Sequence, residues 1–191
     1  MKINKYNIWL ASQSPRRQQL LQELGLDFKV VTKNGLEENY PERLKKHEIP
    51  EFLSQQKANA YINELEKNTL LITADTIVWS ENKVLGKPKD YNDAVNILNS
   101  LSGKKHIVIT GVCLTTKEKQ KTFSTTTEVF FKKLTNEEIN YYITNYKPYD
   151  KAGAYGIQEW IGYIGIEKII GSYFNVVGLP VQKLYSELIT F

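Results

Sequence analysis

The chain has 191 residues and a net charge of +4, with 41% hydrophobic and 24% charged residues. This composition is ordinary for a globular protein and provides enough residues for a sizeable core. The small positive charge favours anionic partners or reflects an ordinary Lys-rich surface. By itself it does not indicate a nucleic-acid-binding protein.

Cysteine, histidine and targeting signals narrow the class of protein further. Cys113 is the only cysteine, which excludes an intramolecular disulfide and fits a reducing compartment. It lies in the apolar run HIVITGVCL, which indicates a buried strand residue rather than a nucleophile. The two histidines, His47 and His106, offer little for a zinc site. We recognise no signal peptide and no stretch long enough to span a membrane, so we expect a cytoplasmic protein.

The N-terminal part of the chain is expected to form a strand, a helix and a second strand. The strands are predicted over residues 6–11 and 28–32. The helix between them has local signals at both ends. Ser14 is a suitable N-cap, Pro15 fits the first helical position, and Gly25 is a suitable stop.

Two arginines occupy the first turn of this helix. Arg16 and Arg17 lie where the helix dipole is already positive, and each should destabilise the helix by roughly 0.3–1 kcal/mol. We therefore expect an anion, such as a phosphate, between the arginines and the exposed backbone N–H groups of the helix start.

A long helix is expected over residues 49–67, and Lys57 lies on its apolar face. The residues of that face recur at every fourth position: Ile49, Leu53, Lys57, Tyr61 and Leu65. Two interpretations of the lysine are equally open. Either its stem packs while the ammonium reaches water, or the ammonium points into a cleft as a charge for phosphate.

Asp75 is the only charged residue between Thr69 and Trp79, in a run that otherwise looks like a buried strand. A carboxylate without partners in an apolar sheet is costly. We expect Asp75 to contact a cation, a metal or backbone donors. The alternative is a purely structural carboxylate, hydrogen-bonded at a bend of the strand.

Two loops carry further charged residues. Lys87 lies between a glycine and a proline in LGKPKD, and such a lysine is usually just exposed. Glu37 and Glu38 lie in GLEEN, where solvated carboxylates are the ordinary case. A second carboxylate near Asp75 would nevertheless form an oxygen site for Mg²⁺ or Mn²⁺.

The remaining elements alternate between strand and helix patterns, which predicts a mixed α/β sheet flanked by helices. We expect a hairpin after residue 79 and then a helix over residues 91–101, which Asp90 caps and Gly103 ends. Two long antiparallel strands should follow, with a turn near Lys119. Thr135 and Glu138 should form a capping box at the start of the next helix, and the last helix should begin after Pro180.

A glycine-rich segment, DKAGAYGIQEWIGYIG, precedes the last helix. Its glycines would let a loop approach a ligand closely, with Tyr155 and Trp160 available for stacking. A simple turn-rich hairpin explains the pattern equally well. The sequence contains neither a GxxxxGK[ST] nor a GxGxxG phosphate-binding motif.

Six stretches of the sequence occur together in one order: LASQSPRRQQLL, ADTIV, GKP, LSGKKHIVITGV, DKAGAYGIQ and NVVGLP. In this respect the chain resembles the Maf family of nucleoside triphosphate pyrophosphatases over nearly its whole length. The resemblance implies a single Maf-like domain over residues 1–191, with a mixed α/β fold similar to that of inosine triphosphatases and two lobes around a cleft. It also implies a homodimer, a divalent metal such as Mg²⁺ or Mn²⁺, and hydrolysis of nucleoside triphosphates to monophosphate and pyrophosphate.

The resemblance also assigns roles to residues of this sequence. It implies that Asp75 is the proton acceptor and that Glu38 and Asp75 are associated with the metal. The residues that it implies for substrate binding are Ser12, Arg16, Arg17, Lys57, Thr76, Lys87 and Gln158. Among these, it associates Arg16, Thr76 and Gln158 with substrate choice. AGAYGIQ is similar to the subgroup that prefers dTTP and UTP, although Glu159 and Trp160 stand where many relatives continue with a glycine.

The resulting hypothesis is metal-dependent hydrolysis of dTTP, UTP and modified pyrimidine nucleotides. Asp75, with Glu38, would hold the metal and position or deprotonate a water that attacks the α-phosphorus. No nucleic acid or membrane is expected as a partner. The alternative is a nucleotide- or RNA-binding regulator of cell division without turnover, and a family member that has kept only the fold is ranked last.

Overall fold

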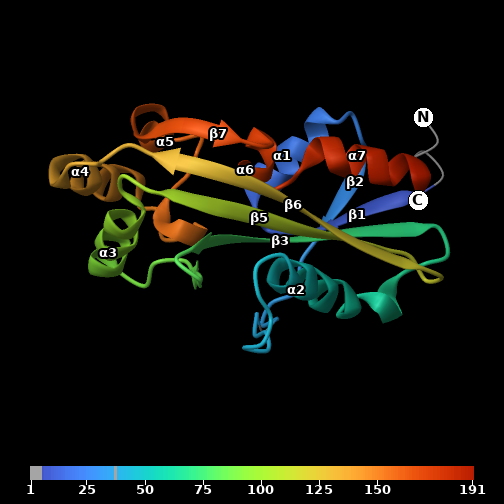
Figure 1. Cartoon of the computed structure of the whole chain (residues 1–191). Helices are drawn as coiled ribbons and strands as arrows, with labels where there is room; N and C mark the ends of the chain where they lie inside the picture. The colour runs from blue at the N-terminus through green and yellow to red at the C-terminus, as the bar shows by residue number, and fades with distance from the viewer. Residues whose placement is uncertain (1–5, 37) are drawn as a thin grey trace. The chain divides into compact units, whose positions relative to one another are not determined.

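A computed structural model describes residues 6–36 and 38–191, so Glu37 lies outside the described residues (Figure 1). Within them, seven strands form one sheet in the order β2-β1-β3-β5-β6-β7, and β4 pairs with β3. The strands are β1 Asn7–Ala11, β2 Phe28–Val31, β3 Thr69–Ser80, β4 Lys83–Leu85, β5 Lys105–Thr115, β6 Gln120–Phe131 and β7 Ile166–Ile170. β1 runs parallel to β2 and β3, whereas β4 and β7 pair antiparallel with their neighbours. This mixed sheet confirms the expected fold class.

Helices connect most of the strands. The α-helices are α1 Pro15–Glu23, α2 Glu48–Asn59, α3 Tyr91–Leu101, α4 Asn136–Tyr146, α5 Trp160–Gly165, α6 Tyr173–Val177 and α7 Val181–Thr190. Two short 3₁₀-helices are η2 Ile62–Glu64 and η3 Ala152–Ala154. Among the described residues, no helix combines the length and apolar character that crossing a bilayer requires.

The chain forms two compact units, which correspond to the two expected lobes. Unit 1 contains the chain up to Asp75 together with Thr110–Thr125 and Gly178–Phe191. Unit 2 contains Thr76–Ile109 and Thr126–Val177. Because β3, β5 and β6 each contribute residues to both units, neither unit is a continuous piece of the sequence. Whether the chain behaves as a single domain stays a prediction.

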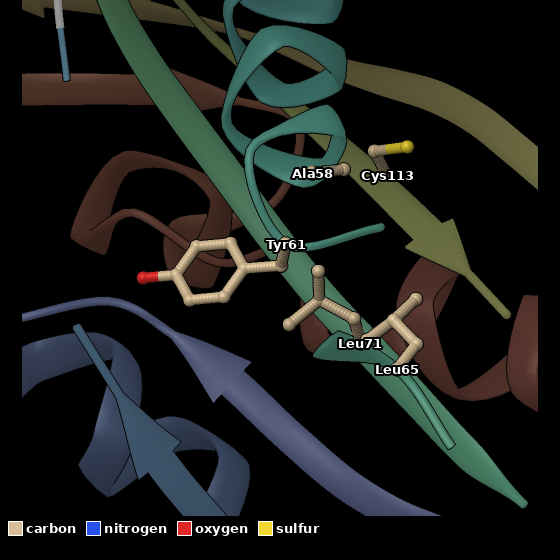
Figure 2. Packing of buried hydrophobic residues seen from close by; sticks show 5 residues of the cluster. All are labelled: Ala58, Tyr61, Leu65, Leu71 and Cys113. Atoms are coloured by element: carbon tan, nitrogen blue, oxygen red, sulfur yellow. The ribbon is translucent and has the colours of Figure 1, made fainter. Parts of the chain in front are cut away.

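In unit 1, α2 lies on one face of the strands, and α1 and α7 lie on the other (Figure 1). A cluster of buried side chains fills the α2 side (Figure 2): Ala58, Tyr61, Leu65, Leu71 and Cys113. Cys113 is therefore a buried strand residue, as its apolar neighbours predicted. Burial raises the pKa of its thiol, which keeps the sulfur protonated and unreactive.

Gly111 is what allows α2 to approach β5 closely. A Cβ atom at this position would lie 2.4 Å from the carbonyl carbon of Pro50 and 2.6 Å from the amide nitrogen of Glu51. These are backbone atoms, which cannot rotate away as the end of a side chain can. Position 111 of the ITGV stretch therefore accepts only glycine.

The prediction of a helix as long as residues 49–67 is wrong, because α2 ends at Asn59. Lys33 donates a hydrogen bond from its ammonium to the carbonyl oxygen of Ala60, and the same ammonium lies 4.8 Å from the centre of the Tyr61 ring. This contact satisfies the helix end. Tyr61 and Leu65 reach the core from the two ends of the short helix η2, which they flank, instead of from a continued helix.

The local signals at the start of the chain are confirmed. Ser14 is the N-cap of α1, where its hydroxyl accepts from the amide of Arg17 at 3.5 Å, and Pro15 is the first helical residue. Gly25 follows the helix with a φ of +69°, a conformation that glycine adopts without strain.

Unit 2 confirms further local predictions. β3 and β4 form the expected hairpin through Glu81 and Asn82, which both have positive φ. Asp90 caps α3 by accepting from the amide of Asp93 at 2.8 Å. Thr135 and Glu138 form the predicted capping box of α4, and α4 packs beside α3 and α5.

Candidate functional site

The start of α1 lies beside β3 in unit 1. Ser12 follows β1, and its hydroxyl accepts from the amide of Ser14 at 3.2 Å. Arg17 donates from Nη1 to the carbonyl oxygen of Ala74 at 2.9 Å and from Nε to that of Gly178 at 2.8 Å. Through Arg17, the first turn of α1 is therefore attached to the residue directly before Asp75.

Arg17 thus also has a structural function that its position in the first turn did not indicate. Burial lowers the pKa of the Arg17 guanidinium, and the positive charge of Arg16 lowers it further. The negative charges of Asp75 and Glu38 act in the opposite direction and offset part of this shift. An arginine remains protonated despite such a shift. The positive charge of Arg17 in the first turn is therefore compensated in part by nearby carboxylates and carbonyl oxygens.

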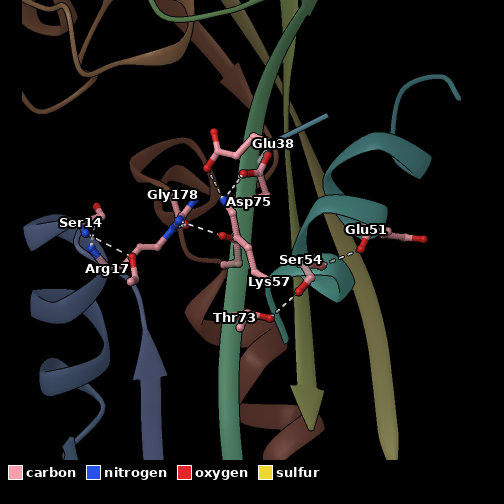
Figure 3. A network of polar contacts seen from close by, with 11 residues as sticks. Ser14, Arg17, Glu38, Glu51, Ser54, Lys57, Thr73, Asp75 and Gly178 are labelled. Carbon is pink, nitrogen blue, oxygen red and sulfur yellow. Dashed lines mark hydrogen bonds and ion pairs between the residues drawn. The ribbon is translucent and has the colours of Figure 1, made fainter. Parts of the chain in front are cut away.

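An acidic and basic cluster lies next to this helix start (Figure 3). The Lys57 ammonium is 2.6 Å from Oδ1 of Asp75 and 2.8 Å from Oε1 of Glu38. Asp75 and Lys57 are largely buried, with side chains 12% and 16% exposed, whereas the Glu38 side chain is 49% exposed. We call these three residues the carboxylate–lysine cluster. The cation expected beside Asp75 is Lys57, and the Lys57 ammonium faces carboxylates instead of bulk water.

The position of Lys57 is fixed by contacts of α2 with β3 and β5. Thr73 donates from its hydroxyl to the carbonyl oxygen of Ser54 at 2.7 Å, and both residues are fully buried. The close approach at Gly111 holds the first turn of the same helix. A lysine one turn beyond Ser54 therefore reaches Asp75 from a rigid base.

The carboxylate–lysine cluster contains the donors that a divalent cation would use. Glu38 and Asp75 converge on one positive charge, and carboxylate oxygens suit Mg²⁺ and Mn²⁺. Among residues 6–36 and 38–191, no group of three or more His, Cys, Asp or Glu side chains could hold a metal ion. Two carboxylates fit a metal that is completed by water and substrate phosphates, the usual arrangement for Mg²⁺.

Three expected site residues belong to unit 2. Thr76 directly follows Asp75 in β3 and is half-buried. Lys87 and Gln158 are exposed and lie in two different loops. The amide of Gly153 donates to the carbonyl oxygen of Gly86 at 3.0 Å, which brings the loop of Lys87 next to the glycine-rich loop that contains Gln158.

The expectation that Tyr155 is available for stacking is wrong. Tyr155 is only 6% exposed, and its hydroxyl lies 2.8 Å from Nε2 of His106, which is itself 2% exposed. Both rings also pack edge-on against Phe131. Trp160 is half-buried and packs against Tyr141 at a centroid distance of 4.7 Å. Tyr155 thus anchors the loop from inside.

Tyr142, Lys151 and Glu159 form a second charged group, which the sequence reasoning did not identify. Lys151 is 8% exposed and lies 3.1 Å from Oε1 of Glu159, whose other oxygen accepts from the Tyr142 hydroxyl. The one available signal was a lysine directly before the stretch AGAYGI, which carries no charge. Nothing in the sequence indicated that Tyr142 on α4 would be its neighbour.

The sheet and the carboxylate–lysine cluster define the class: an α/β protein whose candidate site combines one buried and one half-exposed carboxylate with a lysine, beside two arginines at a helix start. The model of the family described as "Maf-like protein" matches residues 7–191, and the chain belongs to the Maf family.

Relatives with curated names are similar over almost their whole length. The chain is 58% identical to a dTTP/UTP pyrophosphatase of Phocaeicola vulgatus over 186 residues, which cover 97% of this chain and 96% of the relative. It is 56% identical to the protein of the same name from Bacteroides thetaiotaomicron, with the same coverage. A solved nucleoside-triphosphatase / dITP/XTP pyrophosphatase from Mycobacterium abscessus aligns with 67% of this chain and 75% of its own, at 15% identity and a TM-score of 0.43.

Proposed function

We propose that this Maf-family chain is a nucleoside triphosphate pyrophosphatase that acts on dTTP and UTP, and on modified pyrimidine nucleotides of the same base pattern. The observation that carries the proposal is the carboxylate–lysine cluster beside the first turn of α1. The names of relatives at 58% and 56% identity support the enzymatic class and the preference for these two substrates.

The proposed reaction breaks the bond between the α-phosphorus and the oxygen that bridges to the β-phosphorus. The oxygen of a water molecule bonds to the α-phosphorus, and pyrophosphate leaves with the electron pair of the broken bond. Asp75 accepts a proton from this water, and the ammonium of Lys57 at 2.6 Å holds the carboxylate in place. The products are the nucleoside monophosphate and pyrophosphate.

The cations of the site would bind the triphosphate and balance the charge that develops on the leaving pyrophosphate. Arg16 and the amide groups of the first turn of α1 offer donors at a helix start. Lys57 and Lys87 add point charges, and Ser12 adds a hydroxyl. Arg17 contributes positive charge while its hydrogen bonds to Ala74 and Gly178 hold the turn.

Glu38 and Asp75 are the residues that would hold Mg²⁺ or Mn²⁺. When bound, such an ion would neutralise phosphate charge and favour departure of pyrophosphate. Both carboxylates already share one positive charge, so exchange of a lysine contact for the metal would not leave either carboxylate unpaired. We propose metal dependence on this basis.

Base selection is assigned to residues of unit 2 and to Arg16. Gln158 carries an amide with both a donor and an acceptor, which matches the N–H and carbonyl groups of uracil and thymine. Thr76 adds a hydroxyl. Gln158 is exposed at a turn, which leaves its amide accessible to a base.

Three further properties belong to the same proposal. We place the enzyme in the cytoplasm, where nucleoside triphosphates occur and a free thiol such as Cys113 stays reduced. We expect a homodimer, as the family resemblance implies. The alternative of a binding regulator without turnover lacks a specific observation.

The test is pyrophosphate release from a panel of nucleoside triphosphates, with Mg²⁺, with Mn²⁺ and with a chelator. The proposal requires release from dTTP and UTP above the other nucleotides, lost in the chelator and restored by the metal. Release of orthophosphate alone, or no release from any nucleotide, would contradict it.

A further inference from the structure

Gln158 lies in a four-residue turn of unit 2 that is closed by its own backbone. The amide of Glu159 donates to the carbonyl oxygen of Gly156 at 3.0 Å, so Ile157 and Gln158 are the two central residues. Gln158 is exposed, whereas Ile157 is buried. The direction of the Gln158 side chain therefore depends on how firmly Gly156 and Glu159 are held.

A single hydroxyl group holds both ends of this turn. The Tyr142 hydroxyl accepts from the amide of Gly156 at 2.9 Å and donates to the Oε2 atom of Glu159. Tyr142 is fully buried in α4. Burial, and then the carboxylate of Glu159, raise the pKa of Tyr142, so the hydroxyl keeps the proton that it donates.

Lys151 completes the arrangement from the beginning of the same loop. Its ammonium lies 3.1 Å from Oε1 of Glu159 and 2.6 Å from Oδ1 of Asp150. Both carboxylate oxygens of Glu159 are therefore occupied by separate donors. A Cβ atom on Gly156 would lie 2.8 Å from Cδ of Glu159, so the carboxylate packs directly over the glycine.

We propose that Tyr142, Lys151 and Glu159, together called the turn clamp, are positioning residues that determine base specificity by fixing the turn of Gln158. The inference rests on the proposed function, because it assumes that the Gln158 amide reads the base. It assigns to the Glu159 side chain, which precedes α5, a function in substrate choice without contact with the substrate.

The physical reason is geometric. An amide that pairs with two groups of a base must be held in one orientation, and misplacement costs more against the correct base than against others. Loss of the clamp should therefore raise KM for dTTP and UTP while kcat, which depends on residues of unit 1, changes little. We expect the kcat/KM ratio of dTTP to CTP to fall about 10-fold.

The experiment compares Tyr142→Phe, which removes only the hydroxyl, with Tyr141→Phe as the matched control. Tyr141 is the preceding residue of α4 and is 49% exposed. Gly156→Ala is the second variant, because it displaces the Glu159 carboxylate without deleting any polar group. The kcat and KM of each variant are measured with dTTP, UTP, CTP and GTP, and Gln158→Ala is measured alone and combined with Tyr142→Phe.

The inference requires lower selectivity in Tyr142→Phe and Gly156→Ala, unchanged selectivity in Tyr141→Phe, and no further loss when Tyr142→Phe is added to Gln158→Ala. It is overturned if either folded clamp variant keeps the selectivity of the unmodified protein, or loses activity equally on all nucleotides. If Gln158→Ala itself keeps the selectivity, base reading by this residue is wrong, and the inference is overturned with it. That outcome is distinguishable, because pyrophosphate release from dTTP and UTP would continue.

Discussion

Two lysines of this chain each lie between two carboxylates, one in each unit. Lys57 pairs with Glu38 and Asp75, which lie 19 residues before it and 18 after it on a loop and a strand. The Lys151 partners, Asp150 and Glu159, belong to the same loop as the lysine.

The difference separates two uses of the same chemistry. Charges gathered from distant elements stabilise no single segment, and one of the carboxylates around Lys57 is half exposed, so the carboxylate–lysine cluster suits exchange with a charged ligand. Charges from one loop, joined by the buried Tyr142 hydroxyl, hold that loop in shape. Removal of a group should therefore lower turnover in the first cluster, whereas in the second it should cost the shape of the loop and, through KM, base selectivity.

The largest effect is expected from Asp75→Asn. The amide cannot accept a proton from water, so kcat should fall by about 100-fold or more. Steady-state pyrophosphate release from dTTP measures the effect. Asp27→Asn, at an exposed position of the same unit, is the control and should be fully active. Near-normal turnover by Asp75→Asn would remove the catalytic role from the carboxylate–lysine cluster.

The next largest effect is a loss of folding stability at low pH, caused by His106 in unit 2. Burial lowers the pKa of His106 to about 4 from an ordinary 6.5, so the unfolded chain binds the proton more tightly than the folded chain. Stability is therefore lost as pH falls from about 6.5 to about 4, by up to about 3 kcal/mol. Within the described part of the chain its Nδ1 atom has no hydrogen-bond partner, so no neighbour compensates the added charge.

Denaturant unfolding between pH 4 and pH 7 measures this loss. His106→Gln, which does not titrate, should show a shallower pH dependence than the unmodified chain. If the unfolding free energy of the two proteins changed equally with pH, protonation of His106 would not be the cause of the loss of stability.

A matched pair of substitutions tests the comparison itself. Glu159→Gln weakens a partly buried ion pair and should cost about 1–2 kcal/mol of unfolding free energy. Glu38→Gln affects a carboxylate that is 49% exposed and should cost less than about 1 kcal/mol, yet lower kcat/KM about 10-fold. Unfolding curves and kinetics on the same preparations give both numbers. A larger loss of stability in Glu38→Gln than in Glu159→Gln, with unchanged kcat/KM in Glu38→Gln, would contradict this distinction between the two clusters.

The smallest effects are expected at two helix caps. Thr135→Ala removes the capping box of α4 and should cost about 1 kcal/mol without a change in KM. Ser14→Ala should cost about 0.5 kcal/mol, because its hydrogen bond is long at 3.5 Å, but should raise KM for nucleotides by loosening the start of α1. Equal KM values for the two variants would argue against a substrate at that helix start.

Local features of the fold were predictable because their causes lie within a few residues. Ser14 with Pro15, Asp90, and Thr135 with Glu138 mark helix starts by hydrogen bonds to the next turn. The end of α2 was not predictable in this way, since it depends on a lysine more than twenty residues earlier in the chain.

The candidate site was predictable in composition but not in its contacts. The isolated charge of Asp75 and the apolar neighbours of Lys57 singled out both residues, yet only the fold shows that they pair. Arg17 looked like a ligand for an anion, and its bonds to Ala74 and Gly178 join positions 57 and 161 residues away. Local sequence patterns extend over only a few residues and therefore do not reveal contacts between residues so far apart in the chain.

The most direct test of the central claim is hydrolysis of dTTP in isotopically labelled, heavy-oxygen water, followed by mass analysis of both products. Attack at the α-phosphorus, assisted by Asp75, predicts that the label appears in the nucleoside monophosphate and that pyrophosphate stays unlabelled. Label in pyrophosphate, or in orthophosphate released in its place, would contradict the account.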